Sequence, residues 1–340
     1  MKDKTALIVT SIAPPNAVLQ TLAQGCLERD IDFIVIGDVA SPPDFKLEGC
    51  RFYGLAEQRE LSFRFAGKCP TKHYARKNIG YLLAMRDGVS VIIETDDDNH
   101  PHPEFWEERS RHQAVKAVSN SGWVNVYRYF TDANIWPRGL PLDRILTDIP
   151  AFESLKQESV DCPIQQGLAD ENPDVDAIYR LALLLPQSFR KDRRVALGVG
   201  AWSPFNSQNT TWWPEAFPLL YLPAYCSFRM TDIWRSFIAQ RIAWANGWAI
   251  LYHEPTVWQE RNEHNLMRDF RDEVPGYLNN SAICEALDKL SLPSGVDKIN
   301  DNLLSCYEQL IRMELVGREE LDLVEAWTSD LEETSRSVGA

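Results

Sequence analysis

The 340-residue sequence lacks any apolar run close to the roughly 20 residues that a membrane-spanning helix needs. Near the N-terminus only Ala6–Val9 is continuously apolar, which is too short for the core of a signal peptide. We therefore expect no membrane span and a soluble, cytoplasmic protein.

Cysteine pairs are also missing. The seven cysteines are odd in number and scattered, and none forms a C-x-x-C pair. This pattern argues against both a disulfide framework and a zinc ribbon, and it favours reduced thiols.

Basic residues are in short supply, with 35 Lys and Arg against 49 Asp and Glu, which gives a formal net charge of −14. A chain of this charge repels a polyphosphate, so we expect no nucleic-acid partner. The 44% hydrophobic content is that of a globular protein, and the length predicts two domains or one domain with an appendage.

Glycine-rich phosphate-binding loops are absent as well. The segment Thr10–Pro15, which follows the first predicted strand, contains no glycine, so neither G-x-G-x-x-G nor G-x-x-x-x-G-K-[ST] occurs there. Rossmann dehydrogenases and P-loop NTPases are thereby disfavoured. The sequence also has no H-E-x-x-H and no G-x-S-x-G, so the corresponding zinc and serine chemistries have no local support.

The hydrophobic pattern predicts an α/β fold with a mostly parallel central sheet. Apolar strands at 5–10 and 33–37 flank a helix at 17–29, which makes a βαβ unit. A helix is expected over 71–87, a buried strand over 89–93 and a further helix over 232–246. Beyond residue 278 the pattern changes to acidic amphipathic helices, expected at 282–290, 298–315 and 318–333.

Three adjacent aspartates, Asp96, Asp97 and Asp98, follow the predicted strand at 89–93. Ligands of open α/β sheets bind outside the carboxyl ends of the strands. Adjacent carboxylates repel one another, and a hard divalent cation with oxygen ligands relieves that repulsion. The alternative is an acidic, solvated turn. The position favours a Mn²⁺ or Mg²⁺ site held by Asp96 and Asp98.

A basic cluster precedes this strand and consists of Lys68, Lys72, Arg76 and Lys77. On the predicted helix, Lys72 and Arg76 are four residues apart and share a face. Such a face suits an anionic ligand such as a diphosphate, although a solvated helix surface is an equally good interpretation.

Several later residues are candidates with structural alternatives. Asp232, at the start of a predicted helix, suits either a helix cap or a general base that removes a proton from an acceptor hydroxyl. Trp212 and Trp213, in a loop-like stretch, are candidate platforms for a sugar ring. His253 is a candidate metal ligand, although a structural role suits it better.

These features occur in the order of a GT-A glycosyltransferase, and the chain resembles the STELLO glycosyltransferase family over roughly residues 4–277. A more distant resemblance is to the reversibly glycosylated polypeptides and nucleotide-sugar mutases. Five stretches carry the resemblance to STELLO: 75–81 (ARKNIGY), 93–98 (IETDDD), 167–177 (GLADENPDVDA), 228–235 (FRMTDIWR) and 255–262 (PTVWQERN).

The resemblance implies a GT-A-like domain over 1–277, with a nucleotide-binding part at 1–105 and an acceptor part at 106–277, followed by a helical region at 278–340. Its expected ligands are a nucleotide-sugar donor, a hydroxyl acceptor and Mn²⁺ or Mg²⁺. The residues expected to serve them are Thr10, Asp38, Arg76, Lys77, Asp96 and Asp97 for the donor, Asp96, Asp98 and His253 for the metal, Trp212, Trp213 and Asp170 for the acceptor sugar, and Asp232 as the base.

Three functions therefore stay open. The expected one is metal-dependent transfer from a UDP-sugar to a hydroxyl, with inversion. A nucleotide-sugar mutase needs the same donor site but no external acceptor. A non-catalytic regulator of a polysaccharide synthase would keep the fold and dock through the C-terminal helices, and these helices are also the expected contact of a homo-oligomer.

Overall fold

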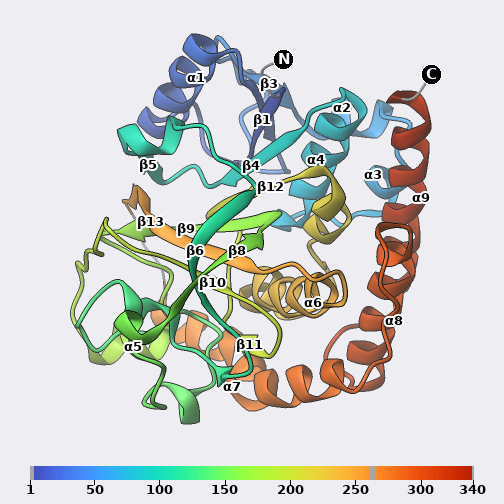
Figure 1. Cartoon of the computed structure of the whole chain (residues 1–340). Helices are drawn as coiled ribbons and strands as arrows, with labels where there is room; N and C mark the ends of the chain where they lie inside the picture. Colours follow the sequence, from blue (N-terminus) through green and yellow to red (C-terminus); the bar gives the residue numbers. More distant parts are fainter. Residues whose placement is uncertain (1–3, 261–264, 339–340) are drawn as a thin grey trace.

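The computed structural model describes residues 4–260 and 265–338, and the last two residues of the fifth resemblance stretch, Arg261 and Asn262, lie outside them. The described residues form an eleven-stranded sheet covered by helices on both faces, together with a separate two-stranded sheet (Figure 1). The order in the large sheet is β3-β2-β1-β4-β12-β9-β13-β10-β6-β8, and β5 pairs with β13.

The N-terminal edge of this sheet is parallel. Strands β3, β2, β1 and β4 pair in that order, all in the same direction. Their bounds, with the first helix, are β1 Thr5–Thr10, α1 Ala17–Arg29, β2 Asp32–Ile36, β3 Arg51–Tyr53 and β4 Val91–Thr95. The chain leaves β1 toward β2 on one side and later returns to β4 on the other side. The carboxyl ends of β1 and β4 therefore form a switch point of the kind where α/β proteins bind ligands.

Strand β1 shows why both sheet faces are covered. Its side chains alternate, so Leu7 and Val9 join the core beneath α1, while Ala6 and Ile8 join the larger core on the opposite face. Helix α4 (Lys77–Arg86) packs closely on this second face, because a Cβ on Gly80 would lie 2.6 Å from Ile8 Cγ2. The glycine of the 75–81 stretch thus permits the close approach of helix and sheet.

The rest of the large sheet is mixed. Strand β12 runs antiparallel to both β4 and β9, while β13 runs parallel to β9 and antiparallel to β10. The remaining strands are β5 Asn99–Pro101, β6 His112–Val118, β7 Gly122–Trp123, β8 Lys156–Asp161, β9 Ile164–Asp170, β10 Arg194–Leu197, β11 Ala201–Trp202, β12 Asn209–Trp212 and β13 Ile250–Gln259.

The remaining α-helices are α2 Leu55–Glu60, α3 Arg64–Lys68, α5 Ala177–Ala182, α6 Thr231–Ala245, α7 Leu266–Asp288, α8 Ile299–Arg312 and α9 Glu320–Val338. Short 3-10 helices connect them: η1 Tyr74–Arg76, η2 Pro103–Trp106, η3 Val126–Tyr129, η4 Leu142–Arg144, η5 Phe152–Ser154, η6 Pro214–Leu220, η7 Phe228–Met230 and η8 Val296–Lys298. No helix within 4–260 or 265–338 combines the length and apolar character needed to cross a membrane.

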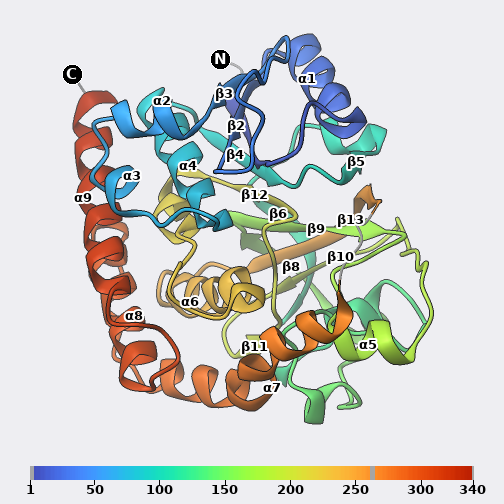
Figure 2. The same ribbon diagram turned by 180° about the vertical axis from the view of Figure 1, so that it is seen from behind.

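The C-terminal helices α7, α8 and α9 run in an arc along one side of the molecule and end beside α3 (Figures 1 and 2). They are fastened to the rest of the chain by buried polar contacts. Asp330 accepts hydrogen bonds from the backbone N–H groups of Arg64 and Phe65, and Trp327 Nε1 donates to the Pro218 carbonyl at 3.0 Å. Helix α7 also passes without a break through the predicted boundary at 277/278.

The predicted α/β fold with a helical C-terminal region is confirmed. Two local predictions were wrong. The helix expected over 71–87 begins only at Lys77, because Lys72 has a φ of 59° and a 3-10 turn precedes α4. Trp212 and its neighbours form strand β12 rather than a loop. The expected homo-oligomer stays a prediction.

Candidate active site

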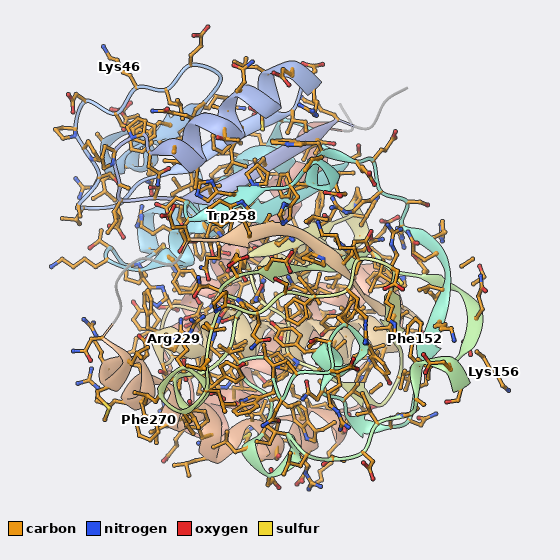
Figure 3. The ribbon with its side chains drawn as sticks, turned by 90° about the vertical axis from the view of Figure 1, so that its left-hand side faces the viewer. Lys46, Phe152, Lys156, Arg229, Trp258 and Phe270 are labelled. Atoms are coloured by element: carbon orange, nitrogen blue, oxygen red, sulfur yellow. The ribbon has the colours of Figure 1, made fainter. Side chains whose placement is uncertain are left out.

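A cavity of about 250 Å³ lies at the switch point between β1 and β4. Its charged lining residues are unbalanced, since five aspartates face two arginines. The aspartates are Asp96, Asp97, Asp98, Asp174 and Asp232, and the arginines are Arg138 and Arg229. Arg229 lies beside the first turns of α7, where it pairs with Glu273 at 2.9 Å (Figure 3). We call this space the acidic cavity, and its excess of carboxylates favours a cationic ligand.

The three adjacent aspartates are held in different ways. Lys77 Nζ contacts Asp96 Oδ1 at 2.9 Å, Ser11 donates to Asp97, and Gln259 Nε2 donates to Asp98 Oδ2 at 3.0 Å. The triplet is thus not a freely solvated turn, because three separate parts of the chain fix its carboxylates.

Burial raises the pKa of Asp96, and the nearby Asp97 and Asp232 carboxylates raise it further, while Lys77 lowers it. Burial likewise raises the pKa of Asp97, against the hydrogen bond from Ser11. A carboxylate whose charge is disfavoured in this way gains from a cation placed beside it. A cation beside the triplet would therefore favour the ionised form of these two carboxyl groups.

Asp232 lies in the first turn of α6 and is almost fully buried. Both of its oxygens accept from Arg138, at 3.0 and 2.9 Å, and Arg138 also binds Asp174 at 2.8 and 2.9 Å. The Tyr74 hydroxyl lies 3.3 Å from Asp232 Oδ1. Burial alone would raise the pKa of Asp232, but Arg138 lowers it to about 2. The side chain is therefore an ionised member of a buried ion pair and caps no helix N–H.

A second cavity of about 410 Å³ adjoins the first, and Thr10, Tyr74, Asp97 and Phe228 line both. Its other walls are mostly apolar and include Ile36, so we call it the apolar cavity. The predicted donor residues Thr10 and Asp38 both line it, and their contact with a nucleoside stays a prediction.

The basic residues do not share one helix face as predicted, because Lys72 precedes α4 and is exposed while Arg76 and Lys77 are buried. The Arg76 guanidinium is buried and donates to Gln58 and to the carbonyl of Cys69. Lys77 Nζ is also buried and binds the carbonyls of Thr95 and Ser207 besides Asp96. Because their donors are used within the protein, these two cations support the walls of the cavities rather than forming a solvated face.

The prediction that His253 joins Asp96 and Asp98 around a metal was wrong. His253 lies six positions before Gln259 on β13, away from the acidic cavity, and its ring Nδ1 contacts the Glu254 carbonyl. Burial, with Arg109 and Arg194 nearby, holds its pKa well below the usual value. No group of three His, Cys, Asp or Glu suited to a metal occurs in the part of the chain that the structure describes.

The predicted sugar-binding residues Trp212, Trp213 and Asp170 do not line the acidic cavity. Trp212 is fully buried, and its Nε1 donates to Glu94 at 2.9 Å. Trp213 is buried in the core beneath α1. Asp170 accepts from the Phe189 backbone N–H at 2.9 Å and does not line the acidic cavity. Both indoles are core residues, since Trp212 ends the buried strand β12 and Trp213 directly follows it.

The residues that complete the site had weak signals in the sequence. Arg138 lies in the proline-rich stretch between 101 and 174, where periodicity predicts no element, and nothing there indicates a partner for Asp232. Asp174 lies within the 167–177 stretch, and Gln259 lies within 255–262, so the family resemblance was the signal that could have found them. Tyr74 directly precedes the 75–81 stretch.

Sequence comparison finds relatives for most of the chain. The sequence model of the STELLO glycosyltransferases matches residues 229–338. Probable glycosyltransferase STELLO2 of Arabidopsis thaliana is 30% identical over 273 residues, covering 72% of this chain and 34% of that protein. Probable glycosyltransferase STELLO1 of the same plant is 29% identical, covering 74% and 35%. The chain thus spans about a third of the length of these relatives.

Among solved structures, that of M. tuberculosis glucosyl-3-phosphoglycerate synthase is 11% identical with a TM-score of 0.42, and it covers 83% of this chain and 81% of that one. The family match and the two plant relatives assign the chain to the STELLO glycosyltransferase family, as its motifs predicted.

Proposed function

We propose that this protein is a metal-dependent glycosyltransferase that moves a sugar from a nucleotide sugar, a UDP-sugar, to a hydroxyl acceptor with inversion. One observation carries the proposal: the Asp96–Asp98 triplet and Asp232 line the same cavity at the sheet's switch point, although about 135 residues separate them in the sequence. Family membership supports sugar transfer in general.

The acidic cavity fits a divalent cation that is shared with a ligand. Mg²⁺ and similar ions are commonly held by one or two carboxylates and complete their shell with water and substrate phosphates. Asp96 and Asp98 would hold Mn²⁺ or Mg²⁺ here. When bound, such an ion supplies charge neutralisation for the departing diphosphate. The elongated donor would extend from the acidic cavity into the adjoining apolar cavity.

Asp232 is the proposed base for the acceptor hydroxyl. Its carboxylate is ionised at neutral pH, but with a pKa of about 2 it is a weak base while Arg138 holds both oxygens. An anionic diphosphate in the cavity would compete for the Arg138 guanidinium, which keeps Asp174 as a second partner. Partial release of Asp232 would then raise its pKa toward the range where it can accept a proton.

The test is a panel of nucleotide sugars incubated with the protein and Mn²⁺, with the released nucleotide and the sugar products both measured. We expect a UDP-sugar to be consumed in a Mn²⁺-dependent way and Asp98→Asn to abolish the turnover. If no nucleotide sugar binds or reacts, the proposal is wrong. If the donor alone returns as a ring-isomerised nucleotide sugar, the protein is a mutase instead.

A further inference from the structure

His73 lies at the wall of the apolar cavity, directly before η1. Its ring Nδ1 accepts a hydrogen bond from the Ala75 backbone N–H at 3.0 Å. A neutral imidazole carries one proton, so this contact leaves the proton on Nε2. Burial lowers the pKa of His73 to about 4, against the effect of Asp38, so the ring is neutral at physiological pH.

The Nε2–H donor of His73 has no partner. The atom is buried, and no hydrogen-bond acceptor reaches it from the residues described. Most buried donors in proteins are satisfied, so an unsatisfied one calls for an explanation. The ring stacks on Tyr74 with centroids 5.5 Å apart, and the His73 backbone N–H donates to Asp38 Oδ2 at 3.0 Å. The donor is therefore preformed, with its direction set by two contacts.

The residues around His73 indicate which kind of ligand group would accept a hydrogen bond from Nε2–H. Ile12, Ile36, Val39 and Phe228 give the cavity apolar walls, which suit a flat heterocycle, while charged residues such as Asp38 and Lys72 also line it. Phe228 packs edge-on against the imidazole with ring centroids 5.1 Å apart, and 47% of its surface is exposed. Phe228 is thus an exposed aromatic neighbour of the imidazole at the wall of this cavity.

We propose that Nε2–H of His73 donates a hydrogen bond to a carbonyl oxygen of the donor's nucleobase, and so selects a carbonyl-bearing base such as uracil over adenine. This inference rests on the proposed function, because it assumes that a nucleoside diphosphate spans the two cavities. It adds a specificity-determining residue in the apolar cavity, which the proposed metal ligands Asp96 and Asp98 do not line.

Two substitutions of His73 separate the hydrogen-bond donor Nε2–H from the structural role of the ring. His73→Asn keeps an acceptor that can cap the Ala75 N–H but removes the Nε2 donor. His73→Gln keeps an N–H donor at about the reach of Nε2 but loses the cap. The ligands are UDP and its 2-thio and 4-thio analogues, each titrated with Mn²⁺ present, since sulfur is a weaker acceptor than oxygen.

We expect His73→Asn to bind UDP about 3- to 10-fold more weakly than the wild type, the range for one neutral hydrogen bond, and His73→Gln to bind better than His73→Asn. One thio analogue should show the same loss with the wild type and no loss with His73→Asn. The inference is overturned if His73→Asn binds UDP like the wild type, or if the wild type binds all three nucleotides equally. If UDP does not bind the wild type at all, the proposed function itself fails.

Discussion

The two adjoining cavities differ in the chemistry of their walls. The acidic cavity is lined by five aspartates and two arginines, whereas the apolar cavity has mostly apolar walls with His73 and Asp38 among them. The elements that build them differ as well, because Arg138, Asp174 and Asp232 come from the C-terminal two thirds of the chain, and the apolar cavity is formed mainly by β1, β2 and their loops. Under the proposed function, sugar transfer and nucleobase recognition would occupy these two adjoining cavities.

Asp232→Asn, a substitution in the acidic cavity, should give the largest change in the rate of sugar transfer. Asn cannot accept a proton, and general-base catalysis contributes about 10²–10⁴-fold, so transfer to acceptor should fall by that factor. The variant should still bind UDP and Mn²⁺. It should lose about 1–3 kcal/mol of stability, because a charged hydrogen bond to Arg138 becomes a neutral one. Transfer rate and melting temperature on one preparation measure both effects.

Asp174→Asn is the matched control, since Asp174 binds the same guanidinium from the other side. It should lose a similar amount of stability while keeping far more transfer activity than Asp232→Asn. Equal losses of activity in the two variants would mean that the ion-pair network, rather than proton transfer to Asp232, is what transfer requires.

Arg76→Met should lower the stability of the fold and weaken ligand binding in the apolar cavity. The buried guanidinium donates to Gln58 and to backbone carbonyls, and its loss leaves these acceptors unsatisfied. We expect a loss of about 2–4 kcal/mol in the free energy of unfolding, together with weaker nucleoside binding. The exposed Lys72 lines the same cavity, and Lys72→Met should change stability by less than about 0.5 kcal/mol. Chemical denaturation measures the free energy of unfolding of both variants, and equal values would contradict this prediction.

The smallest effect concerns the pH dependence of transfer. Arg138 depresses the pKa of Asp232 to about 2, so this proposed base stays ionised and kcat/KM should show no acid limb from Asp232 above about pH 4. The ion pair likewise contributes stability that is present above the ordinary aspartate pKa and is lost as the pH falls toward 2. In Arg138→Met burial dominates, the pKa rises, and an acid limb should move into the range above pH 4. Normalised kcat/KM profiles that superimpose would contradict this.

The sequence could predict the acidic cavity's strand-end carboxylates but not their partners. Alternating apolar strands and the triplet after a buried strand place Asp96–Asp98 at the sheet edge, because parallel strands end together there. Arg138 comes from an irregular segment without periodicity, and its pairing with Asp232 depends on a long-range approach across 94 residues. Local patterns carry no information about such a contact.

Residue type alone was misleading where burial decided the role. Trp212 and Trp213 suggested a sugar platform, and Arg76 and Lys77 suggested a basic face for a diphosphate, but all four side chains are buried. Local charge and aromatic content indicate what a side chain can bind, whereas the mixed sheet order, with β12 inserted between β4 and β9, determines what surrounds it. That order could not be derived from the hydrophobic pattern.

The central claim is that the acidic cavity binds a nucleotide diphosphate through a divalent cation. Calorimetric titration of UDP into the wild-type protein, with Mn²⁺ and with EDTA, and into an Asp96→Asn, Asp98→Asn variant tests it most directly. The carboxylates repel a diphosphate unless a cation lies between them. We therefore expect UDP binding to the wild type only with Mn²⁺, and no gain of UDP affinity from Mn²⁺ in the variant. Equal affinity of the wild type for UDP in Mn²⁺ and in EDTA would contradict the account.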